Sequence, residues 1–97
     1  FEAPERIFNY SVCVEVTGLE GIPEGMVGRW VDQQRYAVFT HRGPGSDMHK
    51  TVDYALGSWL PKSAWKLVEG APSFELYDDR ATAGPDNICE LWVPVMR

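Results

Sequence analysis

Glu75 and Tyr77 stand two residues apart in the stretch SFELYDD (73–79), where a carboxylate and a phenol could together bind a charged ligand. The alternation in this stretch predicts a strand, and side chains two apart on a strand share one face. We therefore expect Glu75 and Tyr77 on one face, with Phe74 and Leu76 on the other, packed against a helix. A carboxylate beside aromatic rings suits an organic cation, because ring faces attract positive charge by ~0.5–2 kcal/mol per contact. Alternation alone favours a plainer alternative, a solvated glutamate on the outer face of a sheet.

Two imidazoles and a carboxylate occur close together in HRGPGSDMH, as His41, Asp47 and His49. Such groups can hold a metal ion, but this spacing matches no metal-binding motif. A turn that leads into a helix, with Ser46 or Asp47 as N-cap, explains the same residues. We therefore expect neither a metal site nor a bound cofactor. The GPG at 43–45 lacks the lysine and the glycine spacing of a phosphate-binding loop.

Nucleophilic catalysis finds little support in the sequence. The serines Ser46 and Ser63 form no recognisable nucleophile–base arrangement with the histidines. The two cysteines, Cys13 and Cys89, are not in CxxC spacing and do not make a disulfide framework. A disulfide between them remains open, but two reduced, half-buried thiols in a cytoplasmic protein is the simpler interpretation. We assign no catalytic residue.

Composition narrows the range of partners. The chain has 97 residues, enough for one small domain, of which 44% are hydrophobic and 12% aromatic. The aromatic content hints at a ring-lined site. A formal net charge of -5 argues against direct nucleic-acid binding, which needs clustered Lys and Arg, and is compatible with a cationic small molecule. No apolar run approaches the ~20 residues of a membrane span, and no signal peptide is visible, so we expect a cytoplasmic protein without a membrane partner.

The elements that would position Glu75 follow from periodicity. Period-two alternation and β-branched or aromatic residues predict strands, and a three-to-four period predicts one helix that ends where Pro61 disfavours it. Pro94 indicates an edge strand or a strand end. The expected order is strands over 6–16 and 28–42 (best formed over 35–42), a helix over 47–60, and strands over 64–69, 73–79 and 88–96. This predicts an α+β fold, a mainly antiparallel sheet with one principal helix packed on one face.

The last strand offers a second ring. Glu90 and Trp92 share one of its faces, opposite Leu91, Val93 and Val95. If this strand pairs with 73–79, an aromatic side chain could stand near Glu75.

Four motifs occur in order along the chain, and together they resemble the GyrI-like family, the effector-binding domain at the C-terminus of many AraC-type regulators. They are YAVFTHRGP (36–44), WLPKSAWKL (59–67), FELYDDR (74–80) and LWVPV (91–95), and NYSVCVEV and IPEGM resemble the family's first strand and loop. The resemblance covers nearly the whole chain. It implies βαββ-like (SHS2) halves around a central groove that binds hydrophobic cations, including dyes and drugs, hence multidrug binding.

The resemblance also implies site residues. Glu75 matches the family's anionic anchor in its F-E-x-Y motif, and aromatic side chains stack around the ligand. The ligand-binding residues expected here are Glu75, Trp59, Tyr77, Trp92, Phe39 and Trp65.

The chain departs from the family pattern in two ways. It has no helix-turn-helix, and the family's first half is missing. We therefore expect 1–97 to be a single GyrI-like module, incomplete at its N-terminus, either truncated or stand-alone, such as a bacterial integron cassette protein. A second copy covering the exposed groove wall and sheet edge would make a homodimer.

Three functions follow as hypotheses. The first is binding of hydrophobic organic cations, for transcriptional effector sensing or for sequestration. The second is a protein-interaction module that inhibits DNA gyrase through an acidic surface, as some relatives do. The third is hydrolysis of strained electrophiles, with Glu75 as general base and Tyr77 orienting water. Binding is preferred over catalysis, because no second acid or metal is evident.

Overall fold

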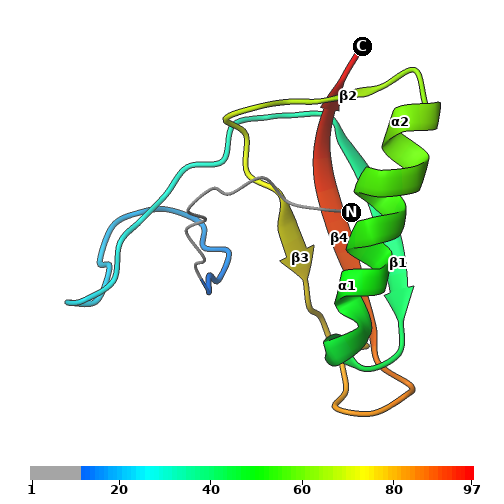
Figure 1. Cartoon of the computed structure of the whole chain (residues 1–97). Coiled ribbons are helices and arrows are strands. Elements are labelled where there is room, and N and C mark those ends of the chain that lie inside the picture. The colour runs from blue at the N-terminus through cyan, green and yellow to red at the C-terminus, as the bar shows by residue number, and fades with distance from the viewer. Residues whose placement is uncertain (1–11) are drawn as a thin grey trace. The chain divides into compact units, whose positions relative to one another are not determined.

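The computed structural model describes residues 12–97, which fall into two units, 12–32 and 33–97 (Figure 1). The second unit contains all the regular elements of the described chain. In order these are β1 (Tyr36–Arg42), the 3-10 turn η1 (Gly45–Asp47), α1 (Met48–Asp53), the π-helical η2 (Tyr54–Trp59), α2 (Leu60–Lys62), β2 (Lys66–Leu67), β3 (Phe74–Leu76) and β4 (Ile88–Met96). None of the helices within 12–97 has the length and apolarity to cross a membrane.

The first unit is irregular over its described part. Residues 6–11 of the strand expected over 6–16 lie outside the described residues, and residues 12–16 form no strand. The side chains of Val12, Val14 and Val16 are all exposed. Alternation identifies an apolar face, but a strand is completed only by backbone hydrogen bonds to a partner, and 12–16 pairs with none of the described strands. A turn closed from Met26 N to Pro23 O (3.1 Å) confirms the loop expected here.

The helical segment runs past the predicted end at Leu60. Its last turn, α2, contains Pro61 and ends at Lys62, because Ser63 adopts an extended conformation. The preceding turn is π-helical, and the Leu60 N–H donates to the carbonyl of Ala55, five residues back. Pro61, which has no N–H to donate, follows this π-helical turn directly and stands in the last turn of the helical segment. The helix start is as expected, with Asp47 at the N-cap, although its side chain makes no capping hydrogen bond.

β4 is the central strand of a four-stranded antiparallel sheet. β1 runs along one side of it, from Tyr36 opposite Pro94 to Arg42 opposite Ile88. β3 and β2 share the other side, with Phe74 opposite Trp92 and Leu67 opposite Val95. Figure 1 shows the helical segment lying over β1 and β4, with β3 beyond its edge. The α+β fold with one principal helix packed on an antiparallel sheet is thus confirmed.

Pro94 therefore does not mark an edge strand, and that part of the prediction was wrong. The carbonyl of Pro94 accepts a hydrogen bond from Val68 N (3.0 Å), on the side away from β1. A strand residue directs its N–H and C=O to the same side. Val68 lies opposite Pro94 in this register, so the missing N–H of Pro94 faces the Val68 carbonyl and one bond of that pair is not made. The proline is tolerated in the central strand because this pair stands at the end of the short β2 ladder, where a single hydrogen bond is lost.

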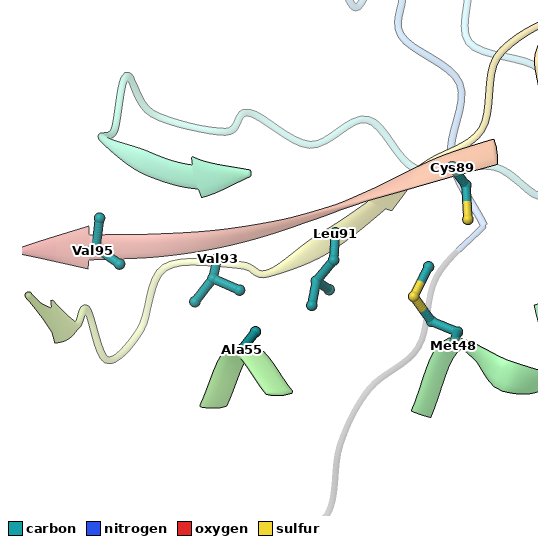
Figure 2. Close-up of a cluster of buried hydrophobic side chains, with 6 residues drawn as sticks. All are labelled: Met48, Ala55, Cys89, Leu91, Val93 and Val95. Atoms are coloured by element: carbon teal, nitrogen blue, oxygen red, sulfur yellow. The ribbon is translucent and has the colours of Figure 1, made fainter. Parts of the chain in front are cut away.

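The core lies between β4 and the helix (Figure 2). Alternate side chains of β4 point at the helix, and Ala55 and Met48 meet them from the other side. The buried set is Met48, Ala55, Cys89, Leu91, Val93 and Val95. Both described cysteines are free thiols; Cys89 is buried as expected, but Cys13 is exposed. Burial raises the pKa of the Cys89 thiol, which suits a packing role better than a nucleophilic one.

Two buried polar side chains, His41 and Asn87, hold the end of the sheet to the helix start. The His41 ring binds Thr51 Oγ1 through Nδ1 (2.6 Å) and donates from Nε2 to the Pro44 carbonyl (3.0 Å). Asn87 donates from Nδ2 to the Gly43 carbonyl (2.8 Å). Because buried polar groups are costly when unpaired, these bonds fix the path of the chain between β1 and α1.

Candidate functional site

The two faces of β3 are the reverse of the prediction. Glu75 lies opposite Leu91, and Phe74 lies opposite Trp92. Directly opposed residues of antiparallel strands share a face. Since Leu91 belongs to the core, Glu75 is on the side that the helix covers, and Phe74 is on the other side. Alternation states which residues share a face, but only the pairing partner decides which face meets the core.

Glu75 and Tyr77 form a hydrogen-bonded pair on this side. The Tyr77 hydroxyl donates to Glu75 Oε1 (2.8 Å). The Glu75 side chain is half-buried, whereas Tyr77 is 55% exposed. No Lys or Arg within 12–97 forms an ion pair with Glu75. The pair is thus a half-buried carboxylate that accepts a hydrogen bond from one phenol.

An aromatic group lies two strands away on the same face. Phe39 is opposite Leu91 on β1, so Phe39, Leu91 and Glu75 form a row across three strands. Neighbouring strands lie ~4.8 Å apart, which places the backbones of Phe39 and Glu75 about 10 Å from one another. The Phe39 ring meets Trp59 edge-to-face at 5.2 Å and Tyr54 at 6.2 Å. The buried side chain of Leu91 lies between Phe39 and Glu75 in this row.

Tyr54 is not among the ligand-binding residues expected from the sequence. It stands five residues before Trp59, a spacing that does not share a face in an α-helix of 3.6 residues per turn. The π-helical turn, with its i→i+5 hydrogen bonds, brings both rings onto Phe39. Tyr54 and Trp59 also line a shallow depression of ≈ 210 Å³ with Ser58, Lys62 and Ser63. This hollow lies along the helix and does not include Glu75.

Trp92 and Trp65 are not brought to Glu75. Trp92 lies on the opposite face of the sheet, stacked on Phe74 (5.3 Å between centroids), with Tyr36 at 5.7 Å. The expected proximity of Trp92 to Glu75 was therefore wrong. Trp65 packs against the core, and its ring is already approached by two cations of the chain, Arg97 at 4.5 Å and Arg35 at 5.5 Å.

The acids Asp78 and Glu90 share one cation, Arg80. Its Nη2 lies 2.7 Å from Asp78 and 3.0 Å from Glu90. The hydrogen bonds from Arg80 lower the pKa of Asp78 to about 2. They also lower the pKa of Glu90, with a smaller contribution from the Trp92 indole, which donates to Glu90 at 3.0 Å. The spacing of YDDR was the available signal for Arg80, since a side chain two residues on reaches back to Asp78.

Comparisons with known proteins bear on the family of the chain. The model of the GyrI-like small molecule binding domain matches residues 1–96. The chain is 30% identical over 96 residues to the transcriptional regulator BrlR of Pseudomonas aeruginosa. That match covers 97% of this chain and 35% of the regulator, so the chain spans about a third of the length of this curated relative. No solved structure matches. As the order of its motifs indicates, the chain belongs to the family of GyrI-like small molecule binding domains.

Proposed function

We propose that this small-molecule binding domain takes hydrophobic organic cations, with the ligand's charge at Glu75 and its rings against Tyr77, Phe39 and Trp59. One observation carries the proposal. Glu75 is a half-buried carboxylate beside a core leucine, and no basic side chain of the described residues is paired with it, whereas Asp78 and Glu90 share Arg80. Removing a carboxylate from water without a counter-charge costs free energy. A bound cation would supply that counter-charge.

The surrounding groups favour a cation with an aromatic body. The rings of Phe39, Tyr54 and Trp59 lie on the same side of the sheet as the carboxylate. Each cation–ring contact contributes ~0.5–2 kcal/mol. Apolar area removed from water adds ~25 cal/mol per Å². Neither term alone distinguishes a charged ligand from a neutral one, and Glu75 provides that distinction.

Effector sensing in the cytoplasm is the use that we propose for this binding, with sequestration as the alternative. A relative that is a transcriptional regulator supports sensing. Because the match covers only a third of that regulator, we assign no DNA-binding role to this chain.

The test is calorimetric titration with a matched pair of ligands, naphthylmethyl-trimethylammonium and its neutral isostere with carbon in place of nitrogen. Glu75→Gln should weaken the cation about tenfold, equivalent to ~1.4 kcal/mol, and leave the isostere unchanged. Glu90→Gln is the control, because it removes one negative charge from the opposite face and should leave the affinity for the cation unchanged. Equal weakening of the cation and the isostere by Glu75→Gln would refute the electrostatic role.

We also propose that two copies associate. Among the described strands β1 pairs with β4 alone, so the backbone groups of Tyr36, Val38, Thr40 and Arg42 point away from the sheet. An open strand edge is a template for pairing with another chain. Sedimentation equilibrium should show a concentration-dependent dimer, and a monodisperse monomer up to millimolar concentration would refute it.

A further inference from the structure

The two oxygens of Glu75 are not equivalent. Oε1 accepts the hydrogen bond from the Tyr77 hydroxyl at 2.8 Å. Oε2 accepts no hydrogen bond from any described residue, and it is not a buried atom. The carboxylate therefore presents one open oxygen to a ligand.

Tyr77 is held in this position from both sides. It follows β3 directly, and its side chain shares the Glu75 face because the two residues are two apart on an extended chain. Asp78 comes immediately after it and closes a turn, because its Oδ1 accepts a hydrogen bond from the Arg80 backbone N–H (3.0 Å). The Arg80 guanidinium donates two further hydrogen bonds to the same carboxylate. Arg80 is in turn anchored to Glu90 on β4. The chain on either side of Tyr77 is thus tied to the sheet.

Because one oxygen of Glu75 already accepts a hydrogen bond and the other does not, different kinds of cation should bind this carboxylate differently. A guanidinium or amidinium binds a carboxylate best through two parallel N–H···O bonds, one to each oxygen. Because Oε1 already accepts from Tyr77, such a fork must share that oxygen with the phenol or displace it, and the bond to Oε1 is then weaker than at a carboxylate with two open oxygens. A protonated amine needs one oxygen, and a quaternary ammonium needs none, since it binds by proximity of charge and by ring contacts.

We infer that Tyr77 is a specificity-determining residue, which selects ammonium-type organic cations and disfavours guanidinium- and amidinium-type ones. This inference rests on the proposed function, because it concerns the ligand of the same carboxylate.

The test compares naphthylmethyl-trimethylammonium with naphthylmethylguanidinium, which share an aromatic body and a charge, by calorimetry on the whole chain. The wild-type protein should bind the ammonium about tenfold more tightly than the guanidinium. Tyr77→Phe frees Oε1 and should bring this ratio to about one or below, chiefly by tightening the guanidinium. Tyr36→Phe removes a hydroxyl from the opposite face of the sheet and should leave the ratio unchanged.

The outcomes separate the two proposals. A wild-type ratio near one, or a ratio that Tyr77→Phe leaves as it was, overturns the specificity role while cation binding stands. Failure of the wild-type protein to bind either cation overturns both. A fall in the ratio with Tyr77→Phe and none with Tyr36→Phe supports the inference, and circular dichroism of the two variants confirms that both are folded.

Discussion

Glu75 lies directly opposite Leu91 in the ladder between β3 and β4, and this pairing turns its carboxylate toward the face on which the helix packs. The same pairing sends Phe74 and Trp92 to the other face, where they stack. The sheet therefore has two distinct surfaces. One carries the hydrogen-bonded pair of Glu75 and Tyr77, and the other carries an aromatic cluster beside Glu90, which is paired with Arg80.

Exchange of tryptophan for phenylalanine distinguishes these two surfaces. Trp59→Phe should weaken naphthylmethyl-trimethylammonium about threefold, because indole is the strongest of the aromatic partners for a cation. Trp92→Phe, the same substitution on the opposite face, should change the affinity less than about twofold. Calorimetric titration measures both. A larger effect at Trp92 than at Trp59 would place the ligand on the other surface.

The facing of the core predicts a contrast between two valines on neighbouring strands. Val93 is 2% exposed and packs under the helix, while Val38 is 45% exposed on the opposite face. Val93→Ala should lower the free energy of unfolding by about 2 kcal/mol, and Val38→Ala by less than about 0.5 kcal/mol. Urea unfolding followed by tryptophan fluorescence gives both values. Similar losses at the two positions would contradict the assigned faces.

We expect Asn87 to contribute strongly to the free energy of unfolding. It is buried, and it satisfies both the Gly43 carbonyl (2.8 Å) and the Thr82 N–H (2.9 Å). Asn87→Ala leaves these groups unpaired and should cost about 2–3 kcal/mol in urea unfolding. The neighbouring Asp86 is exposed, so Asp86→Ala serves as control and should cost less than about 0.5 kcal/mol. A harmless Asn87→Ala would mean that the Gly43 and Thr82 groups find other partners.

The Asp78–Arg80 pair gives a dependence on pH with a defined sign. Arg80 lowers the pKa of Asp78 from its ordinary value of 3.8 to about 2 in the folded protein. A depressed pKa stabilises the folded state above the unfolded value, and this stabilisation is lost as pH falls from 3.8 through about 2. Arg80→Gln should return the Asp78 pKa to about 3.8 and also raise that of Glu90.

Carboxyl carbon chemical shifts followed by NMR from neutral to strongly acidic pH measure both groups directly. Lys62→Gln, which removes an exposed cation elsewhere, is the matched control and should leave the Asp78 titration in place. Titration of Asp78 near 3.8 in the wild-type protein would show that the ion pair between Arg80 and Asp78 is not formed in solution.

The sequence alone determined the type and place of most elements. The alternation over 88–96 and the three-to-four period from Met48 to Leu60 follow from the stereochemistry of the chain itself, so β4 and the helix were predictable. The order of the four motifs also sufficed to identify the family. These are properties that neighbouring residues share, and they need no knowledge of distant partners.

Tertiary structure decided the facing and the pairing. Glu75 and Phe74 each lie on the face opposite to the expected one, because β3 pairs with β4 in a register that places Glu75 opposite Leu91. Pro94 is accommodated in the central strand because the β2 ladder ends beside it, at Val68, where a single hydrogen bond is lost. Each outcome depends on residues far apart in the chain, and alternation is unchanged when a strand is turned over. The sequence thus predicted that Glu75 and Tyr77 lie together, and only the packed sheet decided on which side.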